Sequence, residues 1–148
     1  FTMCLQTENK DKVIIQRLRS NSRESLTKMS KNTKIPISTL FDKLKQQTSI
    51  KKFTILLDFS SLGFHTHSLI SLKVENTKKE DLKKHLLCHT NVNSLYKVNN
   101  GFDFMIEGVF KNLKTMDSFL ESLERNYYIQ EIKVTYLIDE LKKEGFLA

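Results

Sequence analysis

The spacing of the apolar residues changes near Asp58, and this change divides the chain into two parts. Before it, apolar residues recur every three or four positions, as they do on one face of a helix. After it, long stretches alternate between apolar and polar residues, as in β-strands. With one proline and four glycines in 148 residues, the composition argues against disordered, linker-rich and collagen-like chains. The sequence therefore predicts a helical part followed by a part that contains a sheet.

The net charge follows the same division. The chain carries a formal charge of +7, and residues 1–58 hold twelve basic and five acidic side chains, which accounts for all of it. The rest of the chain has equal numbers of both signs. Such an asymmetry is typical of a nucleic-acid-binding part attached to a neutral part, and it makes a polyanion the expected partner.

The basic part predicts three short helices. Residues 9–19 and 23–34 show helical spacing, and Pro36 restarts the chain because proline suits the first turn of a helix. The core face of the third helix is predicted to consist of Ile37, Leu40 and Leu44, with Phe41 beside it. A helix, a short turn and a second helix with a polar, basic outer face form the helix-turn-helix arrangement, which enters the major groove of DNA.

Side chains of this part match the chemistry of DNA contacts. Ser, Thr and Gln reach base edges, and Lys reaches guanine or phosphate. The predicted DNA-binding residues are Arg23, Lys34, Ser38, Thr39, Asp42, Lys43, Lys45, Gln46, Lys51 and Lys52.

The neutral part predicts a β-α-β-β-α-β order. The expected strands cover residues 64–74, 92–98, 102–110 and 129–138, the expected helices cover 76–88 and 113–123, and residues 139–144 are expected to be helical. This order is the ferredoxin-like pattern, in which two helices cover one face of a four-stranded antiparallel sheet. We expect the uncovered face to associate with a second copy, and a dimer would present two basic parts to a palindromic DNA site.

Four segments have a characteristic order and spacing: DKVIIQRL with NSR at residues 11–23, ISTLFDKLK at 37–45, IKKFTILLD at 50–58 and LGF at 62–64. Together they resemble the Lrp/AsnC family of bacterial and archaeal transcription regulators. The resemblance implies an α+β protein with a (winged) helix-turn-helix domain over residues 1–52, a hinge strand or linker over 53–62 and a ferredoxin-like effector-binding and dimerisation domain over 63–148. Two positions depart from the family pattern, since Lys34 and Asn100 stand where it commonly has glycine.

The resemblance also implies partners. Members bind promoter DNA as dimers that often build to tetramers or octamers, and many respond to an amino acid or similar effector. The family places Gly-x-aromatic-Asp at a turn that contributes to effector binding, and the matching residues here are Asn100, Gly101, Phe102 and Asp103.

Two other classes of function stay open from the sequence. A DNA-packaging protein without sequence preference would also use a lysine-rich part, and haem-pathway decarboxylases share the two-part architecture. Histidines 85 and 89 have a spacing that can bind metal, but no third ligand is implied. We therefore expect no enzymatic activity, no catalytic residue, no cofactor and no metal site.

The cellular setting follows from composition. Two cysteines fit a reducing compartment, and no apolar run approaches the length of a membrane span or a secretory signal. The expected location is the cytoplasm, in association with the nucleoid.

Overall fold

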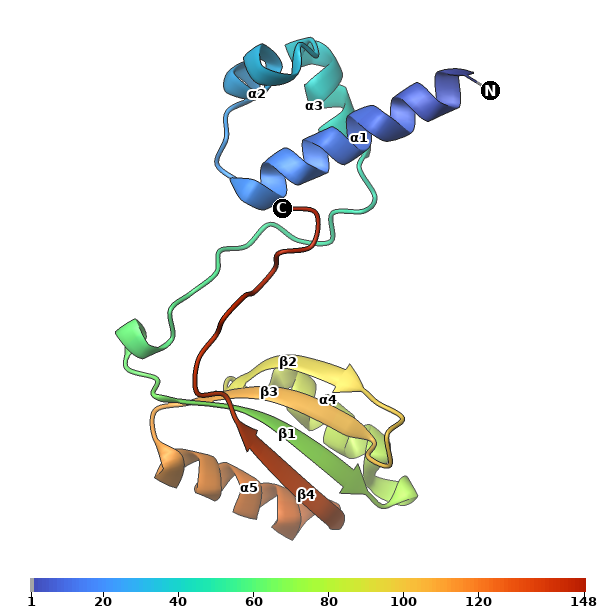
Figure 1. The fold of residues 1–148 in the computed structure, drawn as a ribbon. Helices are drawn as coiled ribbons and strands as arrows, with labels where there is room; N and C mark the ends of the chain where they lie inside the picture. The colour runs from blue at the N-terminus through green and yellow to red at the C-terminus, as the bar shows by residue number, and fades with distance from the viewer. Residues whose placement is uncertain (1) are drawn as a thin grey trace. The chain divides into compact units, whose positions relative to one another are not determined.

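The computed structural model describes the backbone of residues 2–148 and the side chains from residue 9 onward. The chain forms two compact units. Unit 1 is the chain up to Leu56 together with Leu141–Ala148, and unit 2 is Leu57–Glu140. The sequence-based boundaries assign residues 141–148 to the second domain, whereas the structure groups them with the first unit. Figure 1 shows the elements of both units.

Unit 1 contains the three predicted helices: α1 (Thr2–Ser20), α2 (Leu26–Thr33) and α3 (Ile37–Gln46). They enclose a small core of fully or nearly fully buried side chains, namely Ile14, Met29, Ile35 and Leu40. Leu18, Leu26 and Leu44 pack against this core. The helices were predicted from apolar spacing, and the same spacing now accounts for the core.

The structure corrects two assignments on the third helix. Ile37 and Phe41 are 47% and 56% exposed, whereas Ile35 is only 7% exposed. Ile35 lies in the turn before Pro36 and takes the buried place that we predicted for Ile37. The apolar spacing pointed to Ile37, which lies three and seven residues before Leu40 and Leu44, and it could not show that Ile35 is buried from the turn outside the helix.

Local contacts define the turn between α2 and α3. Ser25 caps α2, since its side chain accepts a hydrogen bond from the Lys28 amide at 3.2 Å. At the other end Lys34 adopts a left-handed conformation (φ 57°), and its amide donates to Ser30 O at 2.8 Å. The left-handed conformation has a steric cost for lysine because of its side chain, whereas glycine, which is common at this position after a helix, has no such cost.

Residues 47–57 are extended and form neither the expected hinge strand nor a wing hairpin. Their backbone lies in no sheet of the described chain, and a strand needs a partner for its hydrogen bonds. Phe53 and Ile55 are nevertheless 66% and 71% exposed. The segment thus presents apolar side chains and unpaired backbone to its surroundings.

Unit 2 has the predicted β-α-β-β-α-β order. Its elements are β1 (Thr66–Val74), α4 (Lys79–Cys88), β2 (Val92–Lys97), β3 (Phe104–Phe110), α5 (Leu113–Tyr127) and β4 (Ile129–Tyr136), with short 3₁₀ turns at Ser60–Leu62 and Asn76–Lys78. The sheet order is β2-β3-β1-β4, and all three strand pairs are antiparallel. Both predicted helices lie on one face of the sheet.

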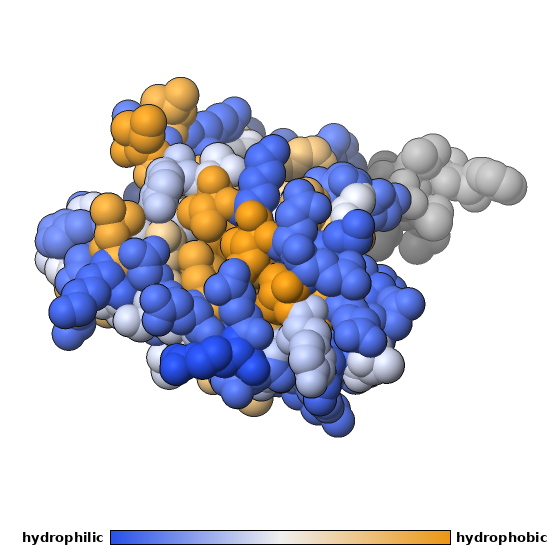
Figure 2. Space-filling model, turned by 90° about the horizontal axis from the view of Figure 1, so that it is seen from below, coloured by the Kyte–Doolittle hydropathy of each residue, from blue (hydrophilic) through white to orange (hydrophobic). Residues whose placement is uncertain are grey.

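Alternation along the strands separates the two faces of the sheet. Ile70 and Leu72 of β1 and Ile106 of β3 are fully buried in the core with residues of α4 and α5. His67 and Leu69, which alternate with them, lie on the face without helices and are half-buried. The face shown in Figure 2 has an apolar area surrounded by hydrophilic residues.

Residues 139–144 were predicted to be helical, and this prediction is wrong. The chain after Tyr136 contains no helix, and Ile138 and Leu141 are almost fully exposed. A helix of six residues is unstable without a surface on which to bury its apolar side. No such surface contacts these side chains.

We predict that Lys34→Gly raises the free energy of unfolding of unit 1 by about 0.5–1 kcal/mol, because glycine adopts the left-handed conformation without steric cost. Chemical denaturation monitored by helical circular dichroism measures this. Lys34→Ala is the matched control, since it removes the same charge and keeps the cost. Equal stability of the two variants would contradict the prediction.

Candidate nucleic-acid interface

The packing of α2 against α3 builds the helix-turn-helix. Met29 of α2, Ile35 of the turn and Leu40 of α3 share one core, so the three-residue connection holds α3 at a fixed angle. The remaining surface of α3 is therefore presented as one defined face.

Polar groups and one aromatic ring occupy that face. Ser38, Asp42 and Lys45 are exposed at helical spacing, and Gln46 follows them at the helix end. Thr39 is half-buried at the edge. Phe41 lies between the polar residues with more than half of its surface exposed, although we predicted it beside the core. Its spacing relative to Ser38 and Lys45 was the signal that could have placed it there.

Lys43 differs from the other predicted DNA-binding lysines because its charge is paired within the unit. Its Nζ is 2.7 Å from Asp11 Oδ1 of α1, and only 17% of its side chain is exposed. The ion pair joins α3 to α1 and directs this cation away from the exposed face.

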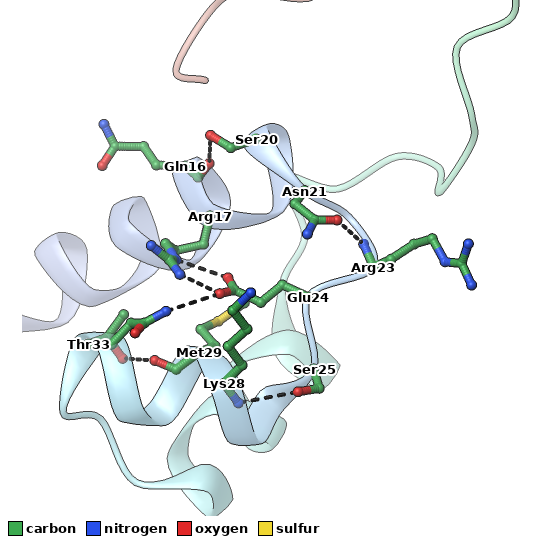
Figure 3. Close-up of polar contacts among 11 residues, drawn as sticks. Gln16, Arg17, Ser20, Asn21, Arg23, Glu24, Ser25, Lys28, Met29 and Thr33 are labelled. Carbon is green, nitrogen blue, oxygen red and sulfur yellow. Dashed lines mark hydrogen bonds and ion pairs between the residues drawn. The ribbon is translucent and has the colours of Figure 1, made fainter.

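A second ion pair fixes the connection between α1 and α2 (Figure 3). The Arg17 guanidinium donates from Nε to Glu24 Oε2 at 2.9 Å and from Nη2 to Oε1, and Asn32 donates to the same carboxylate. Hydrogen bonds from Arg17 lower the pKa of Glu24 below its ordinary value of 4.5, against the opposing effect of burial. Arg17 is thus committed to the fold, whereas the side chain of Arg23 points away from this network (Figure 3).

The remaining predicted cations are exposed. They are Arg23, Lys34, Lys45, Lys51 and Lys52. Within the described residues none of them forms an ion pair. Cations without internal partners are available to bind a polyanion. In α3 and the turn before it, such cations lie together with polar side chains of the kind that can reach bases.

The predicted effector residues lie in the β2–β3 connection of unit 2. Gly101 has a φ of +93°, and Asn100 and Gly101 are exposed. Asp103 is half-buried: its carboxylate accepts from the Val74 amide at 2.9 Å and lies 2.7 Å from Lys79 Nζ. Burial alone would raise the pKa of Asp103, but these hydrogen bonds outweigh it and lower the pKa. Asp103 therefore anchors the connection, and Asn100 to Phe102 remain available above it.

The histidines of unit 2 contact other side chains. His67 Nε2 lies 2.8 Å from Glu107 Oε1, and Asn93 and Ser94 donate to the second oxygen of that carboxylate. The rings of His85 and His89 are 5.4 Å apart, and burial followed by the charge of His85 lowers the pKa of His89. The described residues contain no group of three or more His, Cys, Asp or Glu side chains arranged to hold a metal ion.

The model of the Lrp/AsnC ligand-binding domain matches residues 68–146, more than half of the chain. The chain belongs to the Lrp/AsnC family of transcription regulators. The family match covers nearly all of unit 2, including the connection that carries Asn100 to Asp103.

Curated relatives of this Lrp/AsnC chain are archaeal regulators. An uncharacterised HTH-type transcriptional regulator of Pyrococcus furiosus is 26% identical over 144 residues, covering 91% of this chain and 93% of the relative. The HTH-type transcriptional regulator FL11 of Pyrococcus horikoshii is 28% identical over 114 residues, covering 75% and 76%. Both relatives are aligned over most of their own length.

Solved structures share the fold of this Lrp/AsnC chain. LrpC of Bacillus subtilis superposes with a TM-score of 0.81 at 21% identity, covering 89% of this chain and 94% of that one. A transcriptional regulator of Neisseria meningitidis in complex with L-Met superposes with a TM-score of 0.82 at 18% identity, covering 90% of both chains. In the part of the Lrp/AsnC chain that the structure describes, no helix has the length and apolar character needed to cross a membrane.

We predict that the Arg17–Glu24 pair makes unit 1 sensitive to acid. A carboxyl whose pKa is lowered by folding stabilises the folded state above its unfolded value of about 4.5, and this stabilisation is lost as the pH falls through the folded pKa. Glu24→Gln should therefore lower the thermal unfolding midpoint at about pH 7, and the difference from the unmodified chain should shrink at about pH 3.

Glu121→Gln on the exposed face of α5 is the control for this measurement, since it removes a carboxylate that forms no ion pair with any described residue. If the difference in unfolding midpoint between Glu24→Gln and the unmodified chain stayed constant with pH, the Glu24 carboxylate would not act through its charge.

Proposed function

We propose that this chain regulates transcription by binding specific sites on double-stranded DNA through α3. The observation that carries the proposal is the exposed face of α3, where Ser38, Phe41 and Lys45 lie together on a helix fixed by the helix-turn-helix core. The regulators among its relatives support it. We assign this chain to the cytoplasm at the nucleoid, where it acts by binding DNA rather than by catalysis.

Each exposed group of α3 has a distinct role in this proposal. The Ser38 hydroxyl and the Gln46 amide hydrogen-bond to base edges, and Lys45 donates to guanine or to phosphate. Asp42 accepts from the amino group of cytosine. Phe41 packs against the methyl group of thymine, which is the apolar feature of the major groove.

The other exposed cations bind phosphates. Arg23 and Lys34 flank the helix-turn-helix, and Lys51 and Lys52 follow α3. Contacts of this kind fix the register of the protein on the duplex but carry no sequence information. We do not assign Lys43 to this set, because its charge is paired with Asp11.

Self-association is the second part of the proposal. Phe53 and Ile55 are exposed on an extended segment whose backbone has no sheet partner in the described chain. Pairing with a second copy would satisfy the backbone and bury both side chains. The face of the sheet that carries Leu69 offers a further apolar surface for the same dimer.

Effector binding is the third part. The family model describes a ligand-binding domain, and the Neisseria structure of the same fold is an L-Met complex. An amino acid would bind at the connection of Asn100, Gly101 and Phe102, whose β3 end is held by Asp103. Because the Asp103 carboxylate is already paired, the amide groups of the connection are the contacts that we assign to the effector.

We predict that Lys45→Ala weakens binding to a selected DNA site and lowers the slope of log affinity against log salt by about one. Lys43→Ala is the matched control on the same helix, because it removes the same charge from the Asp11 pair. It should leave the salt slope unchanged and lower stability by up to about 1 kcal/mol. Fluorescence anisotropy over a range of salt concentrations measures both variants.

Competition with random DNA in the same assay separates a regulator from a packaging protein. A preference of about 10³ or more for the selected site supports sequence-specific regulation. Little preference would favour the packaging alternative, and an unchanged salt slope for Lys45→Ala would overturn the role of α3.

We predict that the double variant Phe53→Asp, Ile55→Asp converts the dimer to a monomer. Both side chains are exposed in the single chain, so the substitutions leave its core intact and place four like charges at the expected contact. Sedimentation equilibrium measures the mass. Ile138→Asp is the control, because this apolar residue is also exposed (99%) but lies outside the hinge segment. A dimer in both variants would contradict the prediction.

A further inference from the structure

The C-terminal segment of the chain binds one arginine of the DNA-binding unit. Arg19 is in the last turn of α1, and its guanidinium donates three hydrogen bonds to this segment. Nε donates to Phe146 O at 2.9 Å, Nη2 to Glu144 O at 2.8 Å and Nη1 to Glu144 Oε2 at 3.0 Å. Two carbonyls and one carboxylate therefore surround a single planar cation, which is the geometry in which arginine forms directional contacts.

The backbone of the segment bends around the same contact. Glu144 and Leu147 adopt left-handed conformations, with φ of 53° and 57°. Residues with side chains avoid this region, so a segment that enters it twice within four residues needs contacts to stabilise the bend. Two of the hydrogen bonds to Arg19 are accepted by Glu144 itself, and the third is accepted by Phe146, the residue before Leu147.

Both chain segments that leave unit 1 meet beside this contact. A groove of about 630 Å³ is lined by Ile15 and Leu18 of α1, by Phe53 and Ile55 of the extended segment, and by Glu144. The outgoing chain and the returning C-terminal segment thus share one groove at the end of α1.

We propose that Arg19 is a positioning residue that anchors the C-terminal segment to unit 1. The chain passes between the units twice, at residue 57 and at residue 140. The second passage restrains the helix-turn-helix only because Arg19 anchors the C-terminal segment that follows it. A domain held twice samples fewer orientations than a domain held once. Because a dimer must fit two half-sites at a fixed spacing, the anchor lowers the ordering cost of DNA binding. The consequence for DNA rests on the proposed function, whereas the anchor itself does not.

Amide hydrogen exchange of the full chain tests the anchor directly. Arg19→Ala and Glu144→Ala should each speed the exchange of amides 17–20 and 144–148 by about threefold, as expected for a partly exposed charged contact. The double variant should exchange no faster than Arg19→Ala, because Arg19→Ala already removes all three hydrogen bonds, including the one that Glu144→Ala removes. Lys12→Ala and Glu121→Ala, which remove the same charges from exposed positions without a described ion pair, should leave these amides unchanged.

DNA affinity provides a readout whose sign separates the anchor from simple electrostatics. Removing the negative charge of Glu144 would by itself strengthen binding to a polyanion. The anchor predicts the opposite, a loss of about threefold for Glu144→Ala that is repeated when the chain is ended after Glu140.

Three results are decisive. Unchanged exchange in Arg19→Ala and Glu144→Ala overturns the anchor, and faster exchange with equal or tighter DNA binding overturns its role in DNA binding. If the unmodified chain shows no site preference, the proposed function fails, and the exchange measurement still decides whether the anchor exists.

Discussion

In both units most helices and strands bury one face, although β3 is buried on both, and the interactions that we propose use faces left exposed. In α3, Leu40 is buried and Phe41, Asp42 and Lys45 are not. In β1, Ile70 and Leu72 are buried while His67 and Leu69 lie on the opposite face. The extended segment after α3 buries neither side. The DNA binding and the self-association that we propose use these unburied faces.

The order of elements could be predicted because periodicity records burial, and burial here is regular. The three helices and the β-α-β-β-α-β order were predicted from spacing, and the structure confirms them. Spacing favours Ile37, which lies three and seven residues before Leu40 and Leu44, but the turn between α2 and α3 buries Ile35 instead. Spacing also cannot detect that residues 139–144 have no surface to bury against, which is a property of the tertiary structure.

The structure separates candidate DNA-binding residues that share a residue type. Lys43 lies three residues after Leu40, nearer the core side of α3, and pairs with an acidic residue 32 positions earlier once α1 packs on α3, whereas Lys45 is exposed. The contact of Arg19 with Glu144 spans 125 positions and has no periodic signature at all. Such contacts depend on the packing of distant segments, so they become visible only in three dimensions.

The contacts of Asp103 allow two requirements to be met by different residues: the stability of the β2–β3 connection and the chemistry of its exposed surface. The carboxylate of Asp103 accepts from the Val74 amide at the end of β1 and pairs with Lys79 of α4, and so holds the β3 end of the β2–β3 connection. The exposed residues between, Asn100 and Gly101, do not contribute to the core. Asn100 can therefore change over evolutionary time without loss of the core, whereas Gly101, with a φ of +93°, resists substitution. Descendants of one fold can in this way acquire different chemical selectivities while keeping the same machinery for binding DNA.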